Sequence, residues 1–177
     1  MAQEFETKVL NIDVVKIVKK LEELGAKREK EILYRRFVFT LDSPNDEWIR
    51  LREDGENATI TYKFKAGQGI NETEEIEVMV DDFEKAAELL SKLKFKEKIY
   101  QENKRILFKL KNVEFAVDFW PNIPALLEIE SNNEEKVKES LRHLGLVGMD
   151  SGNLSVINIY KKYGIDLHSI KELKFKD

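Results

Sequence analysis

The stretch Glu4-Phe5-Glu6-Thr7-Lys8 alternates charged and uncharged residues, and this pattern decides our interpretation of the fold. Successive side chains of a β-strand point to opposite faces, so Glu4, Glu6 and Lys8 would share one face. Phe5 would lie on the other face, which can pack against a hydrophobic core. The stretch therefore predicts a strand with one charged face and one apolar face.

Four further stretches repeat this two-residue period. Two are acidic, Glu75-Ile76-Glu77 and Glu128-Ile129-Glu130, and two are basic, Arg50-Leu51-Arg52 and Lys63-Phe64-Lys65. A single pair of this kind is usually a solvent-exposed strand face. Five pairs on separate strands, each with apolar residues in antiphase, indicate that several strands share one charged face. A ladder of cross-strand ion pairs on an open sheet is the structural alternative.

The composition limits the classes of protein to which this chain can belong. Hydrophobic residues make up 42% of the chain and charged residues 36%, which is enough apolar material for a core. The 34 acidic and 30 basic residues give a net charge of −4, so charge alone does not favour nucleic acid as the main partner. The absence of cysteine excludes disulfides and thiolate sites. With neither a signal-peptide pattern nor an apolar run near the ~20 residues of a membrane span, we expect a soluble cytoplasmic protein with no membrane partner. A homodimer is an open alternative.

Capped helices follow the acidic strands. Asp13, Asp82 and Asn133 each precede apolar residues at helical spacing, and Gly25 and Gly145 would end the first and third helices. We expect strands over residues 3–10, 32–39, 73–80 and 126–131, and a hairpin of strands 48–53 and 58–65 around Asp54-Gly55. Two or three more strands are expected between 95 and 119, followed by a short helix near 155–163 and a charged tail.

The order of these elements predicts an α+β fold in a single domain, residues 1–177, with a core over about 3–163. No long linker interrupts the chain. Many antiparallel strands must close on themselves or leave exposed edges. Closure into a barrel would place the charged face inside and the apolar face outside, against the helices.

The charged face combines two kinds of ligand. Clustered lysines and arginines suit a polyanion, with arginine forks for phosphate oxygens. Paired carboxylates offer hard oxygen ligands for Mg²⁺ or Mn²⁺, which often bridge to phosphates. The combination indicates metal-assisted chemistry on a linear polyphosphate. Alternation assigns to this face Glu4, Glu6, Glu75, Glu77, Asp118, Glu128, Glu130, Lys8, Arg50, Arg52, Lys63, Lys65 and Arg105, with Arg36 as an additional candidate.

The motifs together resemble the CYTH superfamily, also called the triphosphate tunnel metalloenzymes. Glu4-Phe5-Glu6-Thr7-Lys8 matches the family's E-x-E-x-K signature. The stretch Tyr34-Arg35-Arg36-Phe37-Val38-Phe39-Thr40 departs from the Tyr-Phe-Asp-Thr-Pro pattern common in the family. The remaining matches, in family order, are Arg50-Leu51-Arg52, Thr61-Tyr62-Lys63, Glu75-Ile76-Glu77, Lys104-Arg105, Val117-Asp118-Phe119-Trp120-Pro121 and Leu127-Glu128-Ile129-Glu130.

The resemblance implies a closed eight-stranded antiparallel β-barrel with helices packed outside, and roles for the charged residues. Triphosphate would bind to Lys8, Arg50, Arg52, Lys63, Lys65 and Arg105. Metal or a metal-oriented water would be held by Glu4, Glu6, Asp118, Glu128 and Glu130, with Glu75, Glu77 and Arg36 as additional site residues. Glu4, Glu6 and Lys8 are the catalytic candidates, and Lys8 would contact phosphate or act as a base.

Three functions fit these expectations. The primary hypothesis is hydrolysis of a triphosphate-containing small molecule, such as tripolyphosphate or thiamine triphosphate, with Mg²⁺ or Mn²⁺ as cofactor. The alternatives are a class IV adenylyl cyclase, which converts ATP to cAMP and pyrophosphate, and a non-catalytic polyphosphate-binding module. A cyclase must also recognise the base and ribose, whereas a hydrolase needs only the triphosphate and water.

Overall fold

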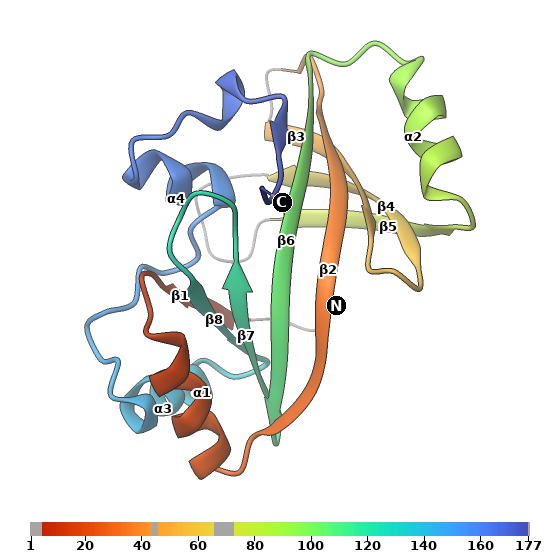
Figure 1. Ribbon diagram of the computed structural model, residues 1–177. Helices are drawn as coiled ribbons and strands as arrows, with labels where there is room; N and C mark the ends of the chain where they lie inside the picture. The colour runs from red at the N-terminus through yellow and green to blue at the C-terminus, as the bar shows by residue number, and fades with distance from the viewer. Residues whose placement is uncertain (1–4, 44–45, 66–72, 177) are drawn as a thin grey trace. The chain divides into compact units, whose positions relative to one another are not determined.

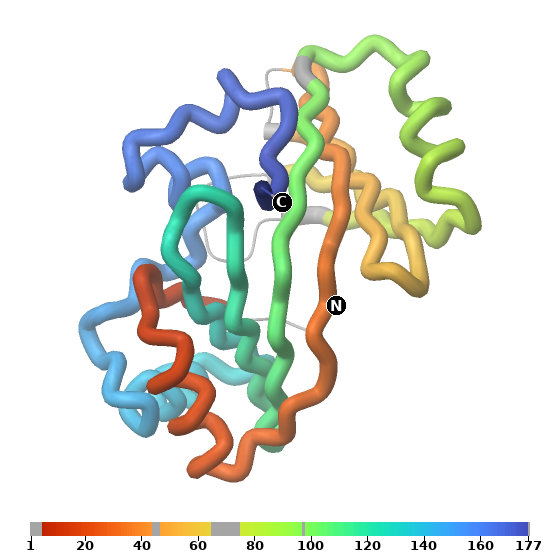
Figure 2. Tube along the Cα trace, in the orientation of Figure 1, coloured from red at the N-terminus to blue at the C-terminus, as the bar shows by residue number. Residues whose placement is uncertain are grey.

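The computed structural model describes residues 5–43, 46–65 and 73–176, without the side chains of Asp46, Lys65, Thr73, Glu74 and Glu97. The chain forms two compact units: unit 1 comprises Met1–Ile32 and Lys104–Ile165, and unit 2 comprises Leu33–Asn103 and Asp166–Asp177. Strands β2 and β6 are each 14 residues long and contribute to both units (Figure 2). The single domain expected over residues 1–177 stays a prediction.

An antiparallel sheet carries the fold, in the strand order β1-β8-β7-β6-β2-β3-β4-β5, and β9 pairs in parallel with β6 (Figure 1). Among the described strands, no pairing joins β1 to β5. The closed eight-stranded barrel is therefore not confirmed. The antiparallel sheet with its helices does confirm the α+β class. The strands are β1 (Phe5–Val9), β2 (Lys27–Thr40), β3 (Asp46–Glu53), β4 (Ala58–Lys65), β5 (Thr73–Val80), β6 (Glu97–Leu110), β7 (Val113–Phe119), β8 (Leu126–Ser131) and β9 (Glu172–Leu173).

Unit 1 contains the helices α1 (Val14–Glu23), α3 (Glu134–Leu144) and α4 (Val156–Lys162). The predicted caps are confirmed: Asp13 accepts from the Lys16 amide at 3.1 Å, and Asn133 accepts from the Glu135 amide at 2.9 Å. Gly145 ends α3 with φ of 68°, a left-handed conformation that glycine adopts without a Cβ clash.

The core of unit 1 lies between its strands and the helices α1 and α3, which pack side by side (Figure 1). Val9 on β1 and Leu127 and Ile129 on β8 are fully buried, and burial of each stabilises the fold by about 1.5–3 kcal/mol. These side chains alternate with Lys8, Glu128 and Glu130, so burying the apolar face fixes the charged face on the other side. The buried core residues are Val9, Ile17, Leu21, Ala26, Phe108, Val113, Phe115, Val117, Leu127, Ile129, Val137, Leu141, Leu144 and Leu146.

Unit 2 is built on the predicted β3–β4 hairpin. Asp54 accepts from the amides of Glu56 at 3.0 Å and Asn57 at 2.9 Å, and Gly55 has φ of 90°. Asp82 caps helix α2 (Phe83–Ser91), which packs against β3 (Figure 1). A second core forms here from Phe39, Leu51, Ala58, Phe83, Ala86, Ala87 and Leu90.

Part of the apolar face of unit 2 is not core, contrary to our expectation. Ile76 is 59% exposed and Val78 is 53% exposed on β5. Helix α2 packs against β3, whereas β5 ends the strand order, two strands away from β3. The helix therefore leaves part of the apolar face of β5 exposed.

The C-terminal segment is more ordered than a charged tail. After a short 3₁₀ turn (Leu167–Ser169), β9 pairs with Tyr100 and Gln101 of β6, and Leu173 is buried. The Glu102 carboxylate accepts from the Tyr100 hydroxyl at 2.8 Å and from the Phe175 amide at 3.1 Å. Within the described part of the chain, none of the helices has the length and apolar character needed to cross a membrane.

Candidate functional site

Three carboxylates of unit 1 converge on the charged face of β1 and β8. The register places Glu6 opposite Glu130 and Lys8 opposite Glu128. One oxygen from each of Glu6, Glu128 and Glu130 lies within 4.8 Å of the others. These three residues are called the acidic cluster below. The side chains of Glu128 and Glu6 are 13% and 28% exposed, so both are only partly reached by solvent.

The geometry of the acidic cluster fits a small divalent cation. Mg²⁺ binds oxygens at about 2.1 Å, so two ligand oxygens of one ion stand at most about 4.2 Å apart. The observed separations need only small side-chain adjustments to reach that range. A cavity of about 20 Å³, lined partly by Glu128 and Glu130, adjoins the cluster and has room for one water-sized species.

Lys8 neutralises part of this negative charge. Its Nζ lies 2.5 Å from Glu6 Oε1, 3.2 Å from Glu128 Oε2 and 3.2 Å from Asn153 Oδ1. An ammonium has three N–H donors, so these contacts use all of them. Burial lowers the pKa of Lys8, but attraction to the Glu128 and Glu6 carboxylates outweighs burial and leaves that pKa above its ordinary value. Lys8 is therefore protonated at neutral pH.

Asn153 joins this site from a loop that our sequence reasoning did not consider. Residues 150–152 pair with β1: the Lys8 amide donates to the Gly152 carbonyl at 3.1 Å and the Ser151 amide donates to the Lys8 carbonyl at 2.7 Å. These backbone bonds position the Asn153 amide beside the Lys8 ammonium. The contact joins residues 145 positions apart, and no local sequence signal predicts it.

Arg105 forms a second charged contact in unit 1. Its Nε lies 2.7 Å from Asp118 Oδ1 and its Nη2 lies 2.6 Å from Asp118 Oδ2, and Nη2 also lies 3.0 Å from Glu128 Oε1. Burial raises the pKa of Glu128, but the charges of Arg105 and Lys8 outweigh burial and hold it below its ordinary value. Asp118, predicted as a metal ligand, thus accepts from Arg105 with both oxygens.

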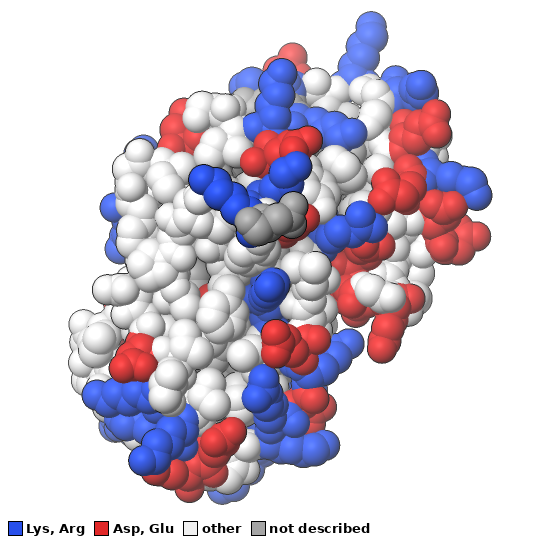
Figure 3. All heavy atoms as spheres, in the orientation of Figure 1, with Lys and Arg blue, Asp and Glu red and all other residues white. Residues whose placement is uncertain are grey.

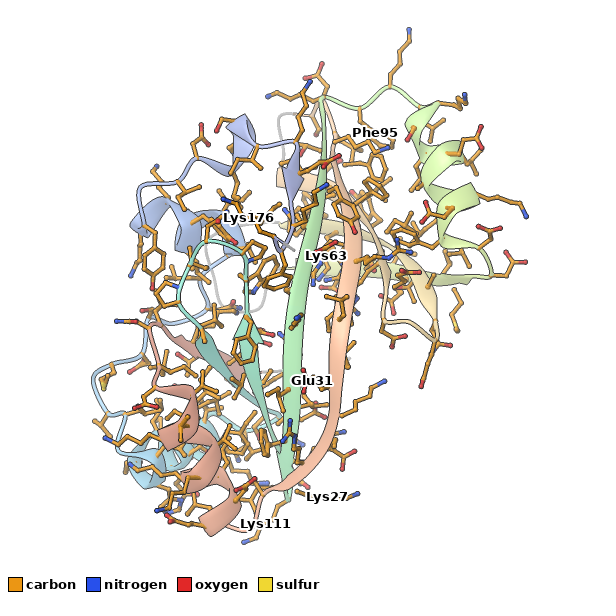
Figure 4. All side chains as sticks on the ribbon, in the orientation of Figure 1. Lys27, Glu31, Lys63, Phe95, Lys111 and Lys176 are labelled. Carbon is orange, nitrogen blue, oxygen red and sulfur yellow. The ribbon has the colours of Figure 1, made fainter. Side chains whose placement is uncertain are left out.

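Basic side chains gather on the charged face of unit 2. Arg36 on β2 lies directly opposite Arg52 on β3, while Arg50 on β3 lies opposite Thr61 on β4. Lys63, which is labelled in Figure 4, is two residues from Thr61 on β4 and therefore points to the same face. Arg36, Arg50, Arg52 and Lys63 are called the basic cluster below. Lys65 belongs to β4, but its side chain lies outside the described residues, as does Glu4.

Carboxylates on β5 neutralise this cluster only in part. Glu77 lies 3.8 Å from Arg50 and accepts from the Thr61 hydroxyl at 2.6 Å, and Glu75 pairs with Lys63. Both carboxylate side chains are nearly half exposed, at 45% and 44%, so solvent screens their attraction. The predicted residues Glu75 and Glu77 therefore share the face of the basic cluster.

The electrostatics of the basic cluster favour an anion. Burial and the neighbouring Arg52 charge lower the pKa of Arg50 to about 10. Burial and the Arg50 charge also lower the pKa of Lys63. The buried Nε of Arg50 has no hydrogen-bond partner within the described parts of the chain. An anion at this site would supply both the missing acceptor and the missing negative charge.

Ordinary surface ion pairs differ from both clusters. On α2 and its cap, Lys85 pairs with Asp82 at 2.9 Å, and Lys92 pairs with Glu88 at 3.9 Å. Acidic and basic side chains are interspersed over the face shown in Figure 3. The two partners of the Lys92–Glu88 pair are each 73% exposed, and such pairs contribute at most about 1 kcal/mol. The acidic and basic clusters therefore differ from the ordinary surface ion pairs in their burial, and not in the number of their charges.

Comparisons with known proteins concern the family and the fold of the chain. The family model described as CYTH domain matches residues 2–151. The chain is 30% identical to "Putative adenylate cyclase MJ0240" of Methanocaldococcus jannaschii, over 94% of this chain and 99% of that protein. The PH1012 protein of Pyrococcus horikoshii has a similar structure, with a TM-score of 0.70 and 29% identity, over 82% of this chain and 92% of that one.

A protein from Hippeastrum shares the fold at lower identity. It is described as "Putative adenylyl cyclase HpAC1 from Hippeastrum", is 16% identical, and aligns with a TM-score of 0.59 over 91% of this chain and 96% of that one. At this identity the likeness concerns the fold alone. The family model covers most of the chain, including Glu6, Lys8, Glu128 and Glu130. This protein belongs to the CYTH domain family.

Proposed function

We propose that this protein hydrolyses the phosphoanhydride bond of a triphosphate and that the reaction depends on a divalent cation. The observation that carries this proposal is the buried, partly neutralised basic cluster, centred on Arg50, in a chain of the CYTH family. Members of this family are triphosphatases or adenylyl cyclases, and HpAC1 is described as having a dominant triphosphatase activity.

The basic cluster would bind the phosphate oxygens. Arg50 and Arg52 offer planar N–H forks that match two oxygens at once, whereas Lys63 offers a single compact charge. A triphosphate carries several negative charges along its length and can contact more than one of these cations at a time. Arg105 and Lys65 stay predicted substrate ligands, together with the additional candidate Arg36.

The acidic cluster would hold Mg²⁺ or Mn²⁺ through Glu6, Glu128 and Glu130, with Glu4 and Asp118 as further predicted ligands. When bound, such a cation neutralises phosphate charge and lowers the pKa of water. Lys8 would donate hydrogen bonds to the carboxylates or to a phosphate oxygen. Its raised pKa favours this role over that of a base, because a base must lose its proton near neutral pH.

A class IV adenylyl cyclase is the second candidate, favoured by the 30% identity to a protein named as an adenylate cyclase. The two reactions leave different products. Purified protein would be incubated separately with tripolyphosphate, thiamine triphosphate and ATP, each with Mg²⁺ or Mn²⁺, and with EDTA as the control.

If the protein is a triphosphate hydrolase, it should release phosphate from at least one of these substrates and lose this activity in EDTA. Formation of cAMP and pyrophosphate from ATP would support the cyclase instead. Binding of tripolyphosphate without turnover of any substrate would support a non-catalytic polyphosphate-binding module and contradict the proposal.

A further inference from the structure

The aromatic ring of Tyr34 contacts two arginines of the basic cluster. The Arg52 guanidinium carbon lies 4.9 Å from the ring centroid, and that of Arg36 lies 5.6 Å from it. Tyr34 and Arg36 are two residues apart on β2, so both point to the same face. Arg52 lies opposite Arg36 on β3 and is thus a diagonal neighbour of Tyr34.

This arrangement compensates for an unfavourable pairing. Like charges placed directly opposite each other destabilise a sheet, and Arg36 and Arg52 occupy such positions. Arg36 is only 9% exposed, so water screens the repulsion poorly on that side. The face of an aromatic ring carries partial negative charge and attracts a guanidinium within about 6 Å. One ring therefore attracts both cations without neutralising either.

A carboxylate in place of the Tyr34 ring would stabilise the sheet more but would weaken phosphate binding. Asn103 accepts from Arg36, and this neutral partner also leaves the arginine charge intact. A carboxylate between Arg36 and Arg52 would stabilise the sheet, but it would compete with phosphate for both forks. Tyr34 lies in the stretch of residues 34–40, where this chain departs from the family's usual pattern.

We propose that Tyr34 is a positioning residue that holds the Arg36 and Arg52 guanidiniums together and charged, ready to bind adjacent phosphate groups. This inference rests on the proposed triphosphate function. The ring, and not the hydroxyl, does the positioning. Substrates with two or more linked phosphates gain from it, because they can contact both forks, whereas a monophosphate contacts one.

The test compares Tyr34→Leu, which removes the ring, with Tyr34→Phe, which keeps it. Tripolyphosphate and inorganic phosphate would be titrated calorimetrically into each variant in EDTA, so that no metal contributes. Tyr163→Leu, at a partly exposed tyrosine at the end of α4, serves as the control for removing an aromatic ring. Tyr34→Ile, whose β-branched side chain suits a strand, replaces Tyr34→Leu if that variant does not fold.

We expect Tyr34→Leu to weaken tripolyphosphate binding about tenfold, which corresponds to two cation–π contacts of about 0.7 kcal/mol each. Tyr34→Phe and Tyr163→Leu should stay within about twofold of the parent protein, and phosphate binding should change less than tripolyphosphate binding. In an Arg52→Gln background, Tyr34→Leu should have a smaller effect, because part of its action passes through Arg52.

Three outcomes overturn the inference. If Tyr34→Leu binds tripolyphosphate as tightly as the parent protein, Tyr34 does not position the arginines. If Tyr34→Phe is as weak as Tyr34→Leu, the hydroxyl acts instead of the ring. If the parent protein itself does not bind tripolyphosphate, the proposed function is contradicted as well. The first two outcomes contradict only the role of Tyr34, so the two kinds of failure can be told apart.

Discussion

Lys8 and Glu128 face each other directly across β1 and β8, with 3.2 Å between Nζ and Oε2. Lys8 also contacts Glu6, so one ammonium links two members of the acidic cluster. Its side chain is 9% exposed, and the attraction is therefore screened far less than in a surface pair. In the absence of metal, this contact keeps the carboxylates close together despite their mutual repulsion.

Replacing Lys8 by methionine should destabilise the protein when metal is absent. The acidic cluster would lose its nearest cation, and removal of one partner from a buried pair costs about 3 kcal/mol. The free energy of unfolding would be measured by urea denaturation in EDTA. Lys19→Met, at an exposed helix pair with Glu23, should cost less than about 1 kcal/mol. Equal losses for the two variants would contradict the structural role of Lys8.

The stabilisation due to Glu128 should depend on pH. The folded-state pKa of Glu128 lies below its ordinary value, so its contribution is present above an unfolded pKa of about 4.3. That contribution is lost as pH falls through the lower folded-state pKa. Glu128→Gln and the parent protein should therefore differ most in unfolding free energy near pH 6 and converge toward pH 2. If the difference in unfolding free energy between the two proteins is the same at pH 6 and pH 2, the charge of Glu128 does not contribute to stability.

Asp118→Asn should reduce stability more than the loss of a surface carboxylate. Asp118 is 2% exposed and accepts two hydrogen bonds from Arg105, so the variant leaves a partly buried guanidinium without its main counter-charge. We expect a loss of about 3 kcal/mol in urea denaturation. Glu134→Gln, which breaks the exposed pair with Lys138, should cost less than about 1 kcal/mol. A small loss for Asp118→Asn would contradict the structural role of the Asp118–Arg105 contact.

Arg50→Met should separate anion binding from folding. Arg50 is a buried cation with a depressed pKa, so its removal should change the melting temperature little in the absence of ligand. Tripolyphosphate should raise the melting temperature of the parent protein, and it should raise that of the Arg50→Met variant much less. The lost contacts correspond to about 1.5–3 kcal/mol, which raises the dissociation constant roughly 10- to 150-fold. Arg142→Met, at an exposed helix residue, should leave the ligand-induced shift unchanged.

Short-range patterns predicted much of the fold because the interactions behind them are local. Asp13, Asp82 and Asn133 cap helices through amides two or three residues away, so the sequence contains both partners. The β3–β4 hairpin was predicted for the same reason, since its turn at Asp54-Gly55 forms within four residues. Alternation also brought Glu6, Glu128 and Glu130 correctly to one face, because their strands are buried on the other.

Features that depend on long-range register could not be predicted. Asn153 reaches Lys8 only because residues 150–152 pair with β1. The contact between Tyr34 and Arg52 requires the alignment of β2 with β3. Exposure of Ile76 depends on which strands α2 covers, and β9 forms against a strand some seventy residues earlier. In each case the deciding partner is distant in sequence.

The metal dependence of tripolyphosphate hydrolysis tests the central claim most directly. Phosphate release would be measured over a range of Mg²⁺ or Mn²⁺ concentrations for the parent protein, for Glu130→Gln, and for Glu139→Gln as an exposed control on α3. We predict that the parent protein and Glu139→Gln need metal to the same extent. Glu130→Gln should fold, lose most turnover, and recover part of it at higher metal, because one charged ligand is missing. Metal-independent hydrolysis, or an unchanged metal response in Glu130→Gln, would contradict the account.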